Sequence, residues 1–504
     1  MANKIVTQNR EVLFVQPSGP GTALSPISIN RHGKDDATDN TVPQRGTLYG
    51  RDAFGRPVSK IEFDQPPGGL VTFNIPHDKL ATPEFLDTAR VYQTKFGLYN
   101  FFIPAGRIDN YANWALKGRL EFYADCKVTQ PTYGAGPAKD YSGNPVTNTY
   151  QITARRLMVL TPPALTALTT SEVNAINDIA GITDLDPNRE IPGYPGADKV
   201  LVAVCDAGSG VSANVLYSIS GGGTWTAFGA DPSGVDEHLK ACVISFITPT
   251  KYRVIVLRDT ANAGQPPRTY WTDVTVGNES ASPTWTTVAL GSTNNQAGEA
   301  IYWGIFNRLI AAAAGDLYVS TNQGESFSSL YTGSNAINAI THDHDDNIWA
   351  VGASNTILRE KSDTLGTVEA LVGPSGGGAM TAIAVARDGL IYVGNGTSIY
   401  KSNNSALNTS GWSALKDFGT NHVVKEIQCI DGESQLLRAL VTDTVGNDGD
   451  VWYSLDGGNT WVEVTNLTNA GYNAAYFSVV NENFMIVVGE ASGGTGAIHK
   501  LTTA

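Results

Sequence analysis

The segment 454–461 reads Ser-Leu-Asp-Gly-Gly-Asn-Thr-Trp and decides the fold of the chain around it. It follows the pattern Ser-x-Asp-x-Gly-x-Thr-Trp, whose specified positions are Ser454, Asp456, Gly458, Thr460 and Trp461. The hydroxyl and carboxylate side chains can satisfy the backbone groups of a tight turn. Glycine permits a positive φ, and the tryptophan begins the next strand and buries its ring. The segment therefore predicts a turn between two strands.

Short apolar runs lie on both sides of this turn. They cover 424–430, 436–441, 451–454 and 461–464, and Gly, Asn and Asp residues separate them. Runs of this length with turn residues between them are typical of antiparallel strands. The unit 423–467 is therefore predicted to be a four-stranded sheet that forms one blade of a β-propeller.

Degenerate copies of the turn occur at two other places. The first copy has Ser in place of the Asp and contains Ser218, Gly222 and Trp225. The second copy has Asn in place of the Asp and Phe in place of the Trp, and contains Ser320, Asn322, Gly324 and Phe327. Looser equivalents lie at 272–285 and 402–412. These copies recur at the positions that a repeating blade predicts.

The repeat divides the C-terminal two-thirds of the chain into units. They are 170–230, 236–290, 297–332, 336–373, 378–419, 422–467 and 472–504. We predict seven blades, with six as the alternative because 170–198 is irregular and rich in Pro. The last unit has only three apolar runs. Its fourth strand is therefore expected from 156–160 or 165–168, which would close the ring.

These repeats resemble the BNR/Asp-box propellers of sialidases, photosystem assembly factors and many phage and secreted glycan-binding proteins. The resemblance implies an all-β propeller domain over 161–504 and leaves the function open. Sialidases need three Arg side chains on the substrate carboxylate, a Tyr nucleophile assisted by Glu, and an Asp acid/base. The family's Arg-Ile-Pro motif is absent, and the propeller's arginines show no family-like spacing. We therefore expect no catalytic residues and no cofactor.

Three features of the propeller sequence allow alternative interpretations. The segment 342–347, His-Asp-His-Asp-Asp-Asn, contains metal-ligand side chains, but a polar turn is expected there, so no metal site is predicted. The pairs Tyr270-Trp271 and Tyr302-Trp303 suit a sugar-binding surface, although packing between blades explains them more simply. Finally, the many acidic residues leave open the paired carboxylates of a glycoside hydrolase.

Charge is unevenly distributed along the 504 residues, whose net charge is −14. Residues 1–165 carry 18 Lys and Arg against 14 Asp and Glu, so the remainder carries −18. An acidic propeller without a basic run disfavours sequence-specific nucleic-acid binding. The cysteines form no CxxC pair, so neither zinc nor a disulfide framework is indicated; they are Cys126, Cys205, Cys242 and Cys429. No signal peptide or membrane span is evident, so we expect synthesis in the cytoplasm without membrane insertion.

Residues 1–160 do not repeat and are predicted to form a β-sandwich or barrel with one helix. Strands are expected at 11–16, 70–75, 98–103, 116–129 and 147–160. The helix is expected at 83–95, because Thr82 suits the N-cap, Pro83 suits the first helical position and Gly97 suits the end. The charged segment 31–60 is interpreted as a long loop that a partner orders.

This order of elements resembles the tail tube proteins of long-tailed bacteriophages. The resemblance rests on 49–57 in the loop, the strand 69–75, the helix and the segment 96–102. It implies homo-oligomeric rings, trimers or hexamers, that stack into a tube. The loop would then contact the next ring through Arg45, Arg51, Asp52 and Arg56.

The expected function is that of a virion structural protein, a tail tube subunit assembled in the host cytoplasm. Other virion tail proteins would be partners, and DNA would pass through the lumen without sequence-specific binding. The propeller would project outward, for decoration or for attachment to host surface glycans. Two alternatives stay open, a phage receptor-binding adhesin and a sialidase-like glycoside hydrolase.

Overall fold

The structure is a computed structural model in which contacts divide the chain into two compact units, Met1–Pro162 and Pro163–Ala504. The described residues are 10–17, 25–30, 37–39, 45–51, 57–64, 70–76, 99–104, 120–132, 147–153, 156–160, 163–168, 174–181, 199–206, 215–232, 238–248, 251–259, 266–280, 283–291, 298–303, 308–343, 347–360, 366–375, 378–402, 411–432, 434–445, 448–467, 470–478, 484–491 and 496–503.

The first unit contains an eight-stranded antiparallel sheet. Seven strands follow one another in the order β2-β1-β7-β8-β9-β6-β3, and β10 also pairs with β8. Their bounds are β1 Arg10–Pro17, β2 Ser25–Asn30, β3 Ala37–Asp39, β6 Leu70–Pro76, β7 Tyr99–Pro104, β8 Leu120–Thr132, β9 Thr147–Thr153 and β10 Arg156–Leu160. The long β8 pairs with β9 through Lys127↔Thr153 and with β10 through Ala124↔Arg156, in one continuous register.

The interpretation of 31–60 as a loop is wrong at several strands, of which β3 lies in the first half of the segment. Strands β4, Arg45–Arg51, and β5, Pro57–Asp64, pair antiparallel with each other. The many charges of this segment favour a loop, but they stand among strand-forming residues such as Tyr49 and Ile61, and a two-stranded ribbon tolerates such a mixture. Arg45 and Arg51 lie in β4, whereas Asp52, Arg56 and the predicted helix 83–95 lie outside the described residues.

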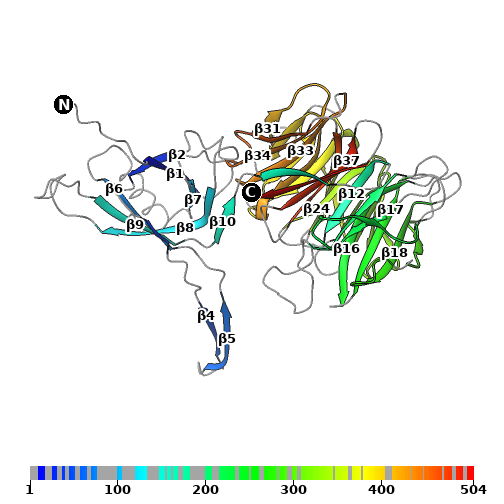
Figure 1. The fold of residues 1–504 in the computed structure, drawn as a ribbon, viewed down its shortest axis with the longest axis horizontal. Helices are drawn as coiled ribbons and strands as arrows, with labels where there is room; N and C mark the ends of the chain where they lie inside the picture. The colour runs from blue at the N-terminus through cyan, green and yellow to red at the C-terminus, as the bar shows by residue number, and fades with distance from the viewer. Residues whose placement is uncertain are drawn as a thin grey trace, which may run out of the picture. The chain divides into compact units, whose positions relative to one another are not determined.

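The second unit is a seven-bladed propeller, which confirms the predicted fold (Figure 1). Each blade is a four-stranded sheet, and the first strand of every blade contacts the first strand of the next, so that the seven close into a ring. Blades 1 to 3 are β12 Ile176–Gly181, β13 Leu201–Cys205, β14 Val215–Ser218, β15 Thr226–Ala227; β16 Leu239–Thr248, β17 Lys251–Arg258, β18 Arg268–Thr275, β19 Thr286–Ala289; and β20 Gly298–Trp303, β21 Leu309–Ala313, β22 Asp316–Ser320, β23 Ser328–Tyr331.

The remaining blades follow the same plan. Blades 4 to 6 are β24 Ile337–His342, β25 Ile348–Gly352, β26 Thr356–Glu360, β27 Val368–Val372; β28 Met380–Val385, β29 Ile391–Asn395, β30 Ser398–Ser402, β31 Trp412–Asp417; and β32 His422–Cys429, β33 Leu437–Asp443, β34 Asp448–Ser454, β35 Val462–Leu467. Blade 7 is β36 Ala470–Phe477, β37 Met485–Ala491, β38 Gly496–Thr503 and β11 Pro163–Leu168.

Strand β11 closes the ring by supplying the fourth strand of blade 7. It pairs antiparallel with β38 from Pro163↔Thr503 to Leu168↔Ile498. Of the two segments expected to close the ring, 165–168 is therefore right and 156–160 is wrong. The second segment forms β10, which is occupied by its pairing with β8 in the first unit.

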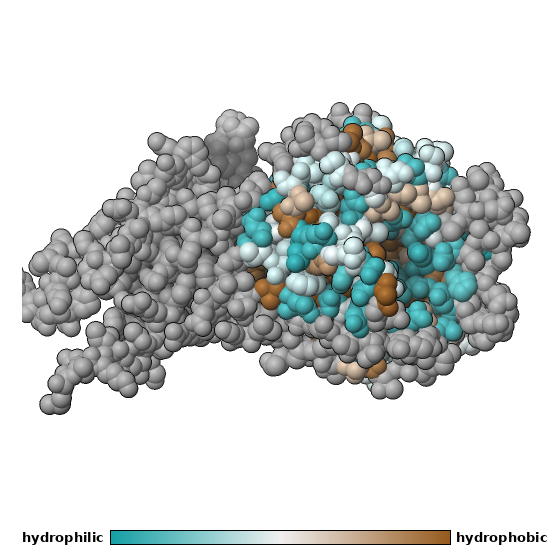
Figure 2. Space-filling view, turned by 90° about the horizontal axis from the view of Figure 1, so that it is seen from above, coloured by the Kyte–Doolittle hydropathy of each residue, from teal (hydrophilic) through white to brown (hydrophobic). Residues whose placement is uncertain are grey.

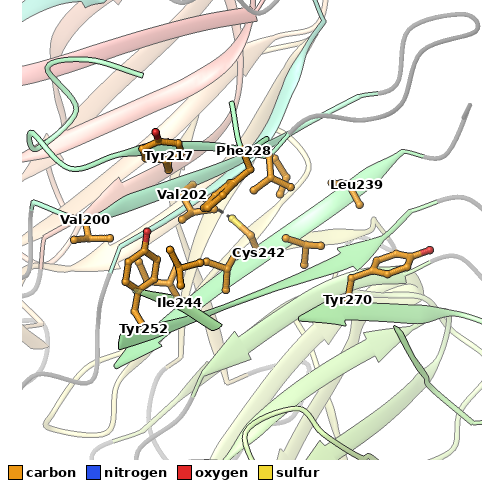
Figure 3. Packing of buried hydrophobic residues seen from close by; sticks show 14 residues of the cluster. Val200, Val202, Tyr217, Phe228, Leu239, Cys242, Ile244, Tyr252 and Tyr270 are labelled. Carbon is orange, nitrogen blue, oxygen red and sulfur yellow. Dashed lines mark hydrogen bonds between the residues drawn. The ribbon is translucent and has the colours of Figure 1, made fainter. Parts of the chain in front are cut away.

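The hydrophobic core of the propeller lies between neighbouring blades. The cluster in Figure 3 joins blades 1 and 2, where Val202 and Tyr217 pack with Cys242, Ile244 and others. Similar clusters join blade 7 to blade 1, and each pair of neighbouring blades from 2 to 6. The second strands are buried along almost their whole length, because each is covered by a blade on both faces.

Helical structure is almost absent from the described residues, which contain the short 3-10 helices Ala353–Asn355 and Ile430–Gly432. A search of the described residues finds no helix with the length and apolar character needed to cross a membrane. Cys205, Cys242 and Cys429 are buried free thiols.

Candidate functional site

The turn at 454–461 is held by its own side chains. The Ser454 hydroxyl accepts a hydrogen bond from Gly458 N at 2.8 Å and donates to Asp456 Oδ1 at 2.9 Å. Asp456 in turn accepts from the backbone N and the hydroxyl of Thr460 at 2.8 and 2.9 Å. Trp461 Nε1 donates to Gly458 O at 3.0 Å, and Gly458 has φ of +88°. Each specified position therefore has a local role in the turn.

The two degenerate turns repeat this bonding with substituted side chains. Gly222 N donates to the Ser218 hydroxyl and Gly324 N donates to the Ser320 hydroxyl, both at 2.9 Å. Ser220 and Asn322 occupy the position that Asp456 has in the turn 454–461. Ser220 accepts from Thr224 N at 2.9 Å, and Asn322 accepts from Ser326 N at 3.0 Å. A hydroxyl or an amide oxygen can therefore replace the carboxylate because both are acceptors.

All three turns also dock on the preceding blade. Trp225 packs in the cluster that joins blade 7 to blade 1, Phe327 packs against blade 2, and Trp461 packs against blade 5. The turn glycines make the same contact, since a Cβ on Gly222 would lie 2.3 Å from Ile486 and a Cβ on Gly458 would lie 2.3 Å from Leu415.

In two of these turns, a basic side chain of the preceding blade also donates a hydrogen bond to a backbone carbonyl of the turn. Lys500 Nζ donates to Gly221 O at 2.7 Å, and Arg253 donates to the equivalent carbonyl, Gln323 O, at 3.0 Å. Arg253 is also paired with Asp273 and Glu325 and stacks over Trp271 at 3.9 Å from the ring centroid. The turns are thus joints between blades, and Arg253 and Trp271 serve that packing.

The two looser copies use their tryptophans differently. Trp285 Nε1 donates to Ala230 O at 2.9 Å, and Trp412 Nε1 donates to Val372 O at 3.0 Å. Both acceptors belong to the preceding blade and not to a glycine of the same turn. These tryptophans therefore tie blades 2 and 5 to their neighbours without the turn pattern.

We expect Ser454→Ala to lower the free energy of unfolding by about 1–2 kcal/mol, because Gly458 N and Asp456 are buried and each would lose a partner. Ser405→Ala, in a segment outside the described turns, is the control. Urea denaturation of both variants measures the difference. Equal midpoints for the two variants would contradict a structural role for the turn.

The described ends of the polar segment 342–347 are hydrogen-bonded to each other, since Asp343 N donates to Asn347 O at 3.1 Å. Asp343 accepts hydrogen bonds from Asn347 N at 3.0 Å and from Trp349 Nε1 at 3.1 Å, while His342 Nδ1 is hydrogen-bonded to the Tyr302 hydroxyl. His344, Asp345 and Asp346 lie outside the described residues. Among the described residues, no group of three or more His, Cys, Asp or Glu side chains could hold a metal ion.

A second set of polar side chains surrounds the axis of the propeller. All seven first strands contain a β-bulge at the same position, where one residue has no partner in the second strand. The seven unpaired residues are all polar or charged and half-buried, and are called the axial ring: Asn177, Lys240, Glu299, Asn338, Thr381, Lys425 and Asn473.

Four members of the axial ring bind the next blade. Each donates to the carbonyl that precedes the bulge of the next first strand: Asn177 to Leu239 O at 2.8 Å, Asn338 to Met380 O at 2.7 Å, Thr381 to Val424 O at 2.5 Å and Asn473 to Ile176 O at 3.1 Å. The last bond joins the final blade to the first. These four side chains therefore hold the first strands together around the axis.

The other three members of the axial ring are charged. Lys240, Glu299 and Lys425 make no hydrogen bond or ion pair with the described residues. Burial lowers the pKa of Lys425, and the positive charge of Lys240 lowers it further. Burial raises the pKa of Glu299, against the attraction of Lys240. The ring is thus interrupted by charges at blades 2, 3 and 6.

In blades 1 and 6 the residue that follows the axial-ring member in the chain has a carboxyl group, Asp178 and Glu426. Asp178 Oδ2 accepts from Cys242 N at 2.8 Å and Glu426 Oε2 accepts from Ala475 N at 2.9 Å, so each bridges to the next blade. Burial raises the pKa of Asp178 to about 7 and that of Glu426 to about 8. The charge of Asp178 adds to the rise at Glu426, whereas the two backbone donors oppose the rises.

The axial ring is not among the features predicted above, although the sequence contains its signal. In each first strand an apolar residue or Gly precedes the polar ring member, and Ala or an acid follows it. Five blades have Ala at that third position, namely Ala241, Ala300, Ala339, Ala382 and Ala474, and the other two have Asp178 and Glu426. An alignment of the seven units on their first strands would have revealed it.

The face of the molecule in Figure 2 shows no broad apolar patch among the coloured residues. Hydrophilic and pale residues cover most of the propeller there, and hydrophobic residues occur in small groups. The large hydrophobic side chains that are exposed in the described part of the chain are Ile219, Val372 and Val445.

Comparisons with solved structures identify propellers of low sequence similarity. YCF48 from Cyanidioschyzon merolae is 15% identical, with a TM-score of 0.48 over 67% of this chain and 99% of the other. YCF48 bound to D1 peptide is 13% identical, with a TM-score of 0.47 over 68% and 97%. The RRP9 WD40 repeats are 11% identical, with a TM-score of 0.47 over 68% and 99%. No protein-family model and no curated protein matches the chain.

Proposed function

We propose that the chain is a self-assembling structural protein, a tail tube subunit of a virion that carries an Asp-box propeller as an outward decoration or attachment domain. The observation that carries the proposal is the β4–β5 ribbon, which is hydrogen-bonded to no other described strand. Its outer edges, and those of the end strands β2 and β3, leave backbone donors and acceptors that a second copy can pair.

Several properties of the propeller support a structural role over a catalytic one. Several of its described arginines are engaged within or between blades, as in Arg308 with Glu360 and Arg359 with Glu369. Arg438 donates to Gln428 and stacks over Phe477 at 4.4 Å. Side chains already paired in this way do not converge on a substrate carboxylate. The Asp-box residues are likewise used in turns.

Assembly is expected to depend on the ribbon. The double variant Leu48→Pro/Tyr49→Pro removes the N–H groups of two adjacent residues of β4. Because successive N–H groups point to opposite edges of a strand, one of the two lost donors lies on the outer edge of the ribbon. We expect the wild type to form rings or tubes and the variant to associate at least about tenfold more weakly. Negative-stain microscopy and sedimentation velocity measure this.

Tryptophan fluorescence provides the folding control, because eight of the nine tryptophans lie in the propeller and Trp114 lies before it. Unchanged thermal melting would show that the variant keeps its propeller. Wild-type protein that stays monomeric at all concentrations, or a proline variant that assembles as well as the wild type, would refute the proposed function.

A further inference from the structure

The axial ring places two lysines opposite each other. Lys240 lies in blade 2 and Lys425 in blade 6, which are three blades apart by the shorter way around the ring. Residues so placed in the ring can approach each other only across the axis. The charge of Lys240 lowers the pKa of Lys425, as expected for two ammonium groups that face each other across the axis.

Neither ammonium makes a hydrogen bond or an ion pair with the described part of the chain. Asn and Thr at four ring positions donate to the next blade, but Lys240 and Lys425 make no such bond. Lys240 lies near the carboxylates of Asp178 and Glu299, which offset its charge. At Lys425, burial and the like charge of Lys240 both act against the ammonium form.

From this arrangement, we propose that the propeller binds a small oxyanion, a carboxylate or phosphate group, on its axis between Lys240 and Lys425. Two ammonium groups provide up to six N–H donors, and an oxyanion has several acceptor atoms that can bind both at once. The bound anion would replace the water lost by Lys425 and would end the repulsion between the two lysines.

The other groups around the axis define the ligand further. Glu299 is an acceptor in the blade next to Lys240, so hydroxyl groups beside the anionic group would find a partner there. A neutral sugar would leave both ammonium groups without a counter-charge and is not expected to bind. The site is independent of the β4–β5 ribbon, so its failure and that of the proposed function are separable.

The test compares three probes on the full chain: sodium glucuronate, inorganic phosphate, and glucose as the neutral control, all at matched ionic strength. We expect glucuronate or phosphate to raise the propeller's melting temperature by about 2 °C or more at saturation, and glucose to leave it unchanged. Whichever anion gives the larger shift identifies the source of the oxyanion.

Lysine variants localise the binding. Lys240→Met and Lys425→Met keep most of the side-chain length and remove the charge, and each is expected to weaken anion affinity in calorimetry at least about tenfold. Lys251→Met, at an exposed position of β17, is the control and should bind as the wild type does. Lys425→Met should melt no lower than the wild type without ligand, because burial acts against the charge that this variant removes.

The proposal is overturned if neither anion stabilises the protein, if glucose stabilises it equally, or if Lys240→Met and Lys425→Met keep the wild-type affinity.

Discussion

Leu165→Pro/Thr166→Pro is expected to open the propeller between blades 7 and 1. The two residues are neighbours in β11 and pair with Leu501 and Lys500 of β38. Because N–H groups alternate in direction along a strand, one of the two prolines must remove a donor that faces β38. We expect the free energy of unfolding to fall by on the order of 3 kcal/mol, measured by chemical denaturation.

The size of this effect reflects the position of β11. It is the strand that ties the beginning of the propeller to its C-terminal strand, and Leu168 at its end packs against the cluster between blades 7 and 1. The control is Leu165→Ala/Thr166→Ala, which keeps both N–H groups. If the proline and alanine variants unfold at the same denaturant concentration, pairing of β11 with β38 does not hold the ring closed.

Stability is expected to decrease from about pH 4 to pH 8. The pKa values of Glu426 and Asp178 are raised by burial to about 8 and about 7 in the folded protein, above their ordinary values of 4.5 and 3.8. The folded state therefore binds these protons more tightly than the unfolded state does. Their stabilising contribution is complete below the unfolded pKa and is lost as the pH rises through the folded pKa.

Glu426→Gln should remove the larger part of this decrease. The amide oxygen can still accept from Ala475 N, but the variant has no negative charge to oppose Asp178. We expect Glu426→Gln to be about 2 kcal/mol more stable than the wild type at pH 9 and nearly equal at pH 4.5. Denaturation of both proteins across this range measures the difference.

Two further variants test the assignment. Asp178→Asn should act in the same direction with a midpoint about one pH unit lower, as the two folded pKa values require. Asp417→Asn is the opposite control, because hydrogen bonds led by Gly419 N lower the pKa of Asp417, so its stabilising contribution is lost as the pH falls. A wild-type stability that is constant from pH 4 to 8, with no gain in Glu426→Gln, would contradict these pKa shifts.

The blade repeat was predictable because its determinants are local. Ser454, Asp456 and Gly458 bond within four residues of one another, and the degenerate turns do the same. Apolar runs separated by turn residues then mark the strands of each blade. Such contacts need only the nearest neighbours in the chain, so a single sequence was enough to predict seven blades, with six as the alternative.

The ribbon was harder to predict for a related reason. Segment 31–60 has charged residues throughout, and a two-stranded ribbon needs no continuous apolar face, so its hydrophobic pattern is weak. Charged residues such as Arg45 and Arg51 therefore favour a loop in the sequence, although both lie in β4.

By itself, the sequence determined the propeller, its repeat and the turn residues that join the third and fourth strands. Only the tertiary structure decided that β11 and not β10 closes the ring, and that Lys240 and Lys425 take facing positions in the axial ring. The reason is the separation of the partners: Asn473 donates to Ile176 O across 297 residues, and pairing of β11 with β38 joins opposite ends of the propeller. Only ring closure brings such distant residues together.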